Sequence, residues 1–136
     1  NPTISIFDAP TRDLCTTRRQ KTNTPLQALV ILNDPTYIEA SRVLGKQITE
    51  AKDVKTGISN TFKKLTGRKI TDQELELLVA LQKEEFKKFE SNPNKAKGWL
   101  QTGAFKLSKT DNKALIAANA VVASTIMNAD ASITKR

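Results

Sequence analysis

The sequence predicts an all-α fold, a helical bundle of about five to six helices preceded by an extended N-terminal arm. Three observations support it. Apolar residues recur every three or four positions after residue 24, prolines and helix-capping residues separate these runs, and no alternating strand pattern of useful length appears among them. A chain of 136 residues with 38% hydrophobic and 26% charged residues is typical of one globular domain.

The first 24 residues differ from the rest of the chain. They contain two prolines and several threonines and arginines, without helical periodicity. Ile4, Ile6 and Phe7 provide an apolar anchor. We therefore divide the chain into an extended arm over residues 1–24 and a helical domain over residues 25–136.

Two proline-initiated helices are expected next. Thr24-Pro25 offers an N-cap threonine and a proline at the first helical position, and Gln27 completes a capping box. Asn33-Asp34-Pro35 ends this short helix, and Asp34-Pro35 begins a second helix that runs to about Glu50.

The third and fourth helices have clear boundaries. The third begins at about Asp53 and ends at Gly67, because glycine adopts the left-handed cap conformation without a Cβ penalty. Its apolar stripe consists of Val54, Ile58, Phe62 and Leu65. A second capping box at Thr71–Glu74 opens the longest helix, about Asp72 to Ser91.

Two further helices complete the domain. Asn92-Pro93 begins a short helix that carries Trp99 and ends at Gly103. Asp111 or Asn112 caps the last helix, which is rich in small side chains: Ala114, Ala117, Ala118, Ala120 and Ala123. Small side chains permit the close approach of a neighbouring helix, so we expect this helix to be central.

Composition excludes several kinds of chemistry within this chain. The absence of histidine rules out a Ser-His-Asp or Cys-His relay, a His-containing zinc site and His-ligated haem. The single cysteine, Cys15, rules out an internal disulfide and a CxxC motif. We expect no cofactor in this chain and, because no apolar run approaches 20 residues, no membrane span.

A long and unusual string of residues resembles a known family. It comprises residues 7–19 (FDAPTRDLCTTRR), 22–29 (TNTPLQAL) and 32–35 (LNDP), with further matches at 65–68 (LTGR), 71–75 (TDQEL) and 128–134 (NADASIT). This pattern is similar to the C-terminal part of the PSD1 domain, also called domain of unknown function 1553. Ala131 and Ser132 depart from the acidic and aromatic pair that is usual near the end of the family pattern.

The resemblance implies a context rather than a reaction. Family members are large exported proteins of planctomycetes, Verrucomicrobia and Bacteroidetes, in which the domain has an N-terminal half and commonly follows a domain of unknown function 1549. A c-type cytochrome domain is often nearer the N-terminus. The chain is therefore expected to be a fragment of an extracytoplasmic protein, with upstream domains of its parent, among them a cytochrome domain, as partners. The family has no established catalytic activity.

The candidate site is a basic cluster in the arm together with a nearby asparagine: Arg12, Arg18, Arg19, Lys21 and Asn23. Arginine presents a planar fork of donors to oxyanions, so the cluster suits an anion or an acidic polysaccharide. The alternative, which we favour, is that its arginines pair with Asp8, Asp13 and Asp34 and tie the arm to the helices. We expect Cys15 to be a small buried hydrophobe rather than a reactive thiol.

These observations favour a non-catalytic interaction or structural module, and we expect no enzymatic activity from this chain alone. The alternative is that Arg18, Arg19 and Asn23 contribute to an anion-binding, glycan-binding or enzymatic site that the missing N-terminal half completes. The net charge of +8 suggests nucleic-acid binding, but it divides into +5 over residues 1–68 (11 bases, 6 acids) and +3 over residues 69–136 (11 bases, 8 acids). Such a spread, without a recognition-helix pattern, disfavours that function.

Overall fold

A computed structural model describes residues 33–104, 106–108 and 111–129. This part of the chain contains α helices and no strands, which confirms the predicted all-α fold. The helices are α3 (Pro35–Glu50), α4 (Val54–Thr66), α5 (Asp72–Ser91), α6 (Pro93–Gln101) and α7 (Lys113–Met127). The predicted arm and the short helix expected after Thr24 lie outside the described residues.

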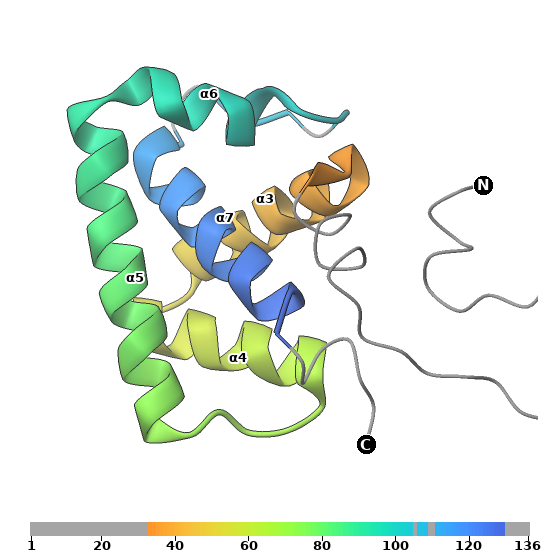
Figure 1. The fold of residues 1–136 in the computed structure, drawn as a ribbon, viewed down its shortest axis with the longest axis vertical. Coiled ribbons are helices and arrows are strands. Elements are labelled where there is room, and N and C mark those ends of the chain that lie inside the picture. The colour runs from red at the N-terminus through yellow and green to blue at the C-terminus, as the bar shows by residue number, and fades with distance from the viewer. Residues whose placement is uncertain (1–32, 105, 109–110, 130–136) are drawn as a thin grey trace, which may run out of the picture.

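Helix α7 is the centre of the bundle. In Figure 1 it runs through the middle of the molecule, with α5 along one side, α6 and α4 across its two ends, and α3 behind it. Nine of its 15 residues are buried. The expectation that the helix rich in small residues is central is therefore confirmed.

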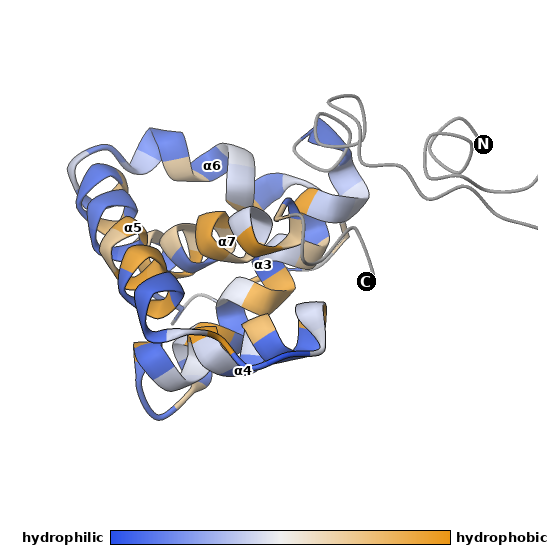
Figure 2. Cartoon of the chain, turned by 60° about the horizontal axis from the view of Figure 1, so that its bottom comes forward, coloured by the Kyte–Doolittle hydropathy of each residue, from blue (hydrophilic) through white to orange (hydrophobic). Residues whose placement is uncertain are grey.

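Two apolar clusters form the core, and α7 contributes to both. The first joins α3, α4 and α7 through the buried residues Ile48, Ile58, Phe62, Val122, Ala123 and Ile126. The second joins α5, α6 and α7 through Phe89, Ala96, Ala117 and Ala118, with Trp99 packed against it. Figure 2 shows the consequence, since α7 is hydrophobic along much of its length while the other helices carry hydrophilic residues on their outer sides. Because α7 supplies both clusters, its removal would expose the apolar faces of its neighbours.

Most helices begin at the capping residue that the sequence predicts. Asp34 Oδ1 accepts a hydrogen bond from Thr36 N at 2.8 Å, and Asp53 Oδ1 accepts one from Thr56 N at 2.8 Å. For α7, the cap is Asn112 rather than Asp111. These side chains satisfy backbone donors that have no partner within the helix.

Helix α6 begins where the sequence predicts, with Pro93 directly after the N-cap residue Asn92, whose side chain makes no capping hydrogen bond. The helix ends at Gln101, and Gly103, two residues on, adopts a left-handed conformation with φ 86°. The predicted glycine stop therefore lies just past the last helical turn, in the conformation that glycine adopts there.

Candidate functional site

The basic cluster predicted from the sequence lies outside the described residues. Arg12, Arg18, Arg19, Lys21, Asn23 and Cys15 all belong to the first 32 residues, so their roles stay predictions. The described part of the chain does contain Asp34, one of the carboxylates proposed to pair with the arginines. Its side chain caps α3.

A hollow lies between the end of α5, α6, the segment after α6 and the start of α7. Its volume is about 820 Å³. The wall is mainly apolar, and the side chains that make it so are Phe89, Pro93, Ala96, Leu100, Leu107 and Ala114. We refer to it as the α6 pocket. A concave, apolar hollow of this size is typical of binding sites for small molecules.

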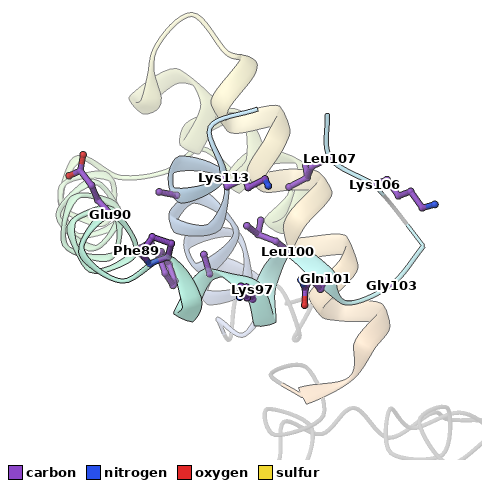
Figure 3. Close-up of a pocket in the computed structure, with 12 residues that line it drawn as sticks. Phe89, Glu90, Lys97, Leu100, Gln101, Gly103, Lys106, Leu107 and Lys113 are labelled. Atoms are coloured by element: carbon purple, nitrogen blue, oxygen red, sulfur yellow. The ribbon is translucent and has the colours of Figure 1, made fainter. Parts of the chain in front are cut away.

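Charged side chains at the α6 pocket are predominantly positive. Lys97, Lys106 and Lys113 line it, together with one acid, Glu90. Figure 3 shows the amino group of Lys113 directed toward Leu107, near the middle of the lining residues, while Lys106 extends outward. The carboxylate of Glu90 lies on the outer side of α5 and points away from the lysines. The pocket therefore combines an apolar wall with an excess of positive charge.

Helix α3 holds two walls of this pocket in place. Arg42 is fully buried, and its Nη1 donates a 2.6 Å hydrogen bond to the carbonyl oxygen of Leu100 at the end of α6. Lys46, one turn later, lies 3.6 Å from Asp111, whose carboxylate also accepts a hydrogen bond from Ser108 N at 2.8 Å. These contacts attach both the end of α6 and the segment before α7 to the same helix.

A second hollow, of about 520 Å³, lies between α4 and α5. Its charged side chains balance, with two lysines and two acids: Lys55, Lys83, Asp72 and Glu76. The excess of positive charge thus distinguishes the α6 pocket from this one.

The junction between α4 and α5 forms a tight set of ionic and hydrogen-bond contacts. The guanidinium group of Arg68 binds both carboxylate oxygens of Glu74 and lies 4.7 Å from the centre of the Phe62 ring. Glu74 also accepts a hydrogen bond from Thr71 N at 2.9 Å, and Glu74 N donates to the Thr71 hydroxyl at 3.3 Å, which confirms the predicted capping box. Gly67 ends α4 in the left-handed conformation, with φ 77°.

These contacts change the acidity of Glu74. The hydrogen bonds from Arg68, and after them those from Thr71, stabilise the charged carboxylate and lower its pKa from 4.5 to about 2. Glu74 therefore acts here as a permanently charged structural anchor near neutral pH.

A set of ion pairs lies on the surface of α5. Lys88 Nζ lies 2.7 Å from Glu84 and 2.8 Å from Glu85. Hydrogen bonding and charge from Lys88 lower the pKa of Glu84. Acid–base catalysis by two carboxylates requires that they face a common cleft. Glu84 and Glu85 instead both bind Lys88 on the surface of α5.

Within residues 33–104, 106–108 and 111–129, no cluster of three or more His, Cys, Asp or Glu side chains is arranged to hold a metal ion. No helix in this same part of the chain is long and apolar enough to cross a membrane.

Comparison with known families adds one match. The family model of PSD1, described as a protein of unknown function (DUF1553), matches residues 1–82. The chain belongs to the PSD1 family. The resemblance seen in the sequence is thereby confirmed for the segments between residues 7 and 75, whereas residues 128–134 lie beyond the match. No curated protein and no solved structure matches the chain.

The end of the PSD1 match falls inside a helix. Residue 82 lies in the middle of α5, whereas the buried residues of α7 begin at Ile116. Because α7 packs against α3 and α5, residues beyond the match complete the core of the part that matches. The structural unit therefore continues through α7.

Proposed function

We propose that this chain is a non-catalytic helical interaction module that packs against neighbouring parts of a longer, exported PSD1 protein. The observation that carries the proposal is the α4–α5 junction. Its residues Gly67, Arg68, Thr71 and Glu74 belong to the segments that resemble the PSD1 pattern. Gly67 ends α4, Thr71 and Glu74 cap α5, and Arg68 binds Glu74. These four residues of the family pattern thus stabilise the fold.

The other acidic side chains in well-defined contacts support the same proposal. Asp34 and Asp53 cap helices, Asp111 contacts Lys46, and Glu84 and Glu85 bind Lys88. A general acid or base needs a carboxylate directed at a substrate, with a pKa adjusted for proton transfer. These five are instead bound to backbone amides or lysines of the same bundle.

The experiment separates this chain from the rest of its parent. The 136-residue chain and the upstream part of the same protein are expressed separately and mixed in a calorimeter. A module predicts saturable association between the two, abolished when either is unfolded. The absence of association at high concentration would contradict the proposal.

A second arm of the experiment examines catalysis. The parent protein and the 136-residue chain are screened for glycan binding and for hydrolase activity, with Arg18→Gln and Asn23→Ala variants of each. The proposal predicts that neither substitution changes turnover by the parent. Turnover that is lost in a variant with unchanged thermal unfolding would show that these residues belong to an active site completed by the upstream part.

A further inference from the structure

We propose that the α6 pocket binds an apolar organic anion, that is, a small molecule with a hydrophobic body and one negatively charged head group. The proposal does not depend on the function proposed above, because it concerns a ligand of this chain alone. It would stand even if the upstream part of the parent failed to associate.

The volume and the lining of the pocket suit such a ligand. The volume of about 820 Å³ falls within the range of about 300–1,000 Å³ that is usual for small-molecule sites. Phe89 and Ala96 are buried, while Leu100, Leu107 and Ala114 are half-buried, so a hydrophobic body would cover apolar surface that water now reaches.

The charge of the pocket selects for an anion. Lys97, Lys106 and Lys113 are exposed, and none of them lies in an ion pair with an acid of the described part of the chain. The one acid of the wall, Glu90, points away from them. The carboxylate of Glu39 lies beside Gly103, which belongs to the wall. Among the described lining residues, the three lysines still outnumber the acids, so a head group at this rim would meet an excess of positive charge.

Lys113 adds an energetic argument. It is the first residue of α7, where the helix carries its positive end, so a cation at that position is unfavourable. An anion bound beside Lys113 would interact favourably with both the ammonium group and the helix end. The unfavourable placement in the free protein would thereby become favourable in the complex.

The distribution of exposed apolar side chains favours a small ligand over a protein partner. A protein interface needs an apolar patch that extends across the surface. Among the described residues, the exposed large hydrophobic side chain is Leu77, which is 72% exposed and does not line the α6 pocket. In the described part of the chain, the apolar surface near α6 that water reaches therefore lies inside the α6 pocket and not around it.

The test uses two probes with the same aromatic body. The first, 1-anilinonaphthalene-8-sulfonate, carries a negative charge, and the second, N-phenyl-1-naphthylamine, is neutral. Each is titrated into the 136-residue chain while its fluorescence is followed. We expect saturable binding of the sulfonate at one site and weaker binding of the neutral probe.

Variants then separate charge from apolar contact. One unit charge at 4 Å in water contributes about 1 kcal/mol, which is about a fivefold change in affinity, so Lys97→Gln and Lys113→Gln should each weaken sulfonate binding by about that factor. Binding of the neutral probe should stay unchanged. The matched control is Lys69→Gln, which removes an exposed lysine in the α4–α5 loop, at the opposite end of the bundle, and should affect neither probe. Leu107→Ser should weaken both.

Three results would overturn the proposal: no saturable sulfonate binding to the unaltered chain, equal losses in Lys69→Gln and Lys113→Gln, or equal affinities for the two probes. Thermal unfolding of every variant shows whether the fold is retained. Should a variant unfold, competition on the unaltered chain decides, because octanoate must displace the bound sulfonate at a lower concentration than octanol does. Displacement at equal concentrations contradicts the selection for an anion.

Discussion

Gly45 of α3 lies directly against the backbone of Ala120 in α7. A β-carbon on Gly45 would lie 2.6 Å from the amide nitrogen of Ala120 and 2.8 Å from the carbonyl oxygen of Ile116. Main-chain atoms of a buried helix cannot move away without shifting the helix itself. The contact between the two helices therefore depends on the absence of a side chain at residue 45.

Replacing this glycine should separate α3 from α7. Gly45→Ala gains helix propensity, by up to about 1 kcal/mol, but overpacking of a close contact costs about 1–3 kcal/mol, so we expect net destabilisation. The matched control is Gly98→Ala in α6, where an added β-carbon meets nothing within 4 Å. It should stabilise the chain. Urea unfolding followed by circular dichroism measures both, and stabilisation by Gly45→Ala would contradict the packing.

The C-cap of α4 offers a test of backbone conformation alone. Gly67 has φ 77°, and a β-carbon there would meet no atom within 4 Å. Gly67→Ala should therefore cost about 1–2 kcal/mol through the left-handed conformation rather than through a clash. Gly67→Asn should cost less, because asparagine adopts this conformation more readily. Equal free energies of unfolding for the alanine variant and the original chain would refute the assigned cap.

The Arg68–Glu74 contact should make stability depend on pH. The folded state lowers the pKa of Glu74 from 4.5 to about 2, so its contribution is complete above about pH 5 and is lost as the pH falls toward 2. Glu74→Gln retains the capping box but removes the charge. Because the pair with Arg68 is partly exposed, the free energy of unfolding at pH 7 should fall by about 0.2–1 kcal/mol.

The measurement is the difference in free energy of unfolding between the original chain and Glu74→Gln at pH 7, 4 and 2.5. The difference should shrink as the pH falls. Glu76→Gln, an exposed substitution on the same helix, is the control and should show less change. A difference that is constant over this range would mean that Glu74 carries no special interaction.

A buried polar link between α3 and α7 can be measured with a double-mutant cycle. Asn119 is fully buried, its Nδ2 donates to Thr49 Oγ1 at 2.8 Å, and that hydroxyl donates to the carbonyl oxygen of Gly45 at 2.9 Å. Asn119→Leu and Thr49→Val should be coupled by about 0.5–1.5 kcal/mol. The effects of Asn119→Leu and Thr125→Val should be additive, because the hydroxyl of Thr125 donates to the carbonyl oxygen of Val121 within α7. Additivity in both cycles would place Asn119 and Thr49 out of contact.

The boundaries of the helices could be read from the sequence because they depend on local chemistry. Asp34, Asp53 and Thr71 hydrogen-bond to amides two or three residues away, and Gly67 relieves a strain within its own backbone. Local patterns of this kind are visible in the residues themselves. The end of α6 follows the same rule, because Gly103 adopts the left-handed conformation just past its last residues.

The contacts between helices could not be predicted in the same way. Arg42 is buried, although arginine usually lies at the surface. Its hydrogen-bond partner, the carbonyl oxygen of Leu100, is 58 residues away in the sequence, so no local pattern predicts the contact. The α6 pocket likewise combines residues from three helices and a connecting segment. The sequence does contain an excess of lysines between residues 95 and 113, but this excess does not show which side chains meet.

Helix α7 lies beyond the PSD1 match, and we conclude that it organises the whole bundle. Amide hydrogen exchange of the intact chain tests it most directly, because each helix reports its own opening. We predict that amides of residues 116–126 exchange as slowly as the slowest amides of α3, and only through global unfolding. Faster exchange throughout α7 than in α3, α4 and α5 would show that those helices stay folded without it, and would contradict the claim.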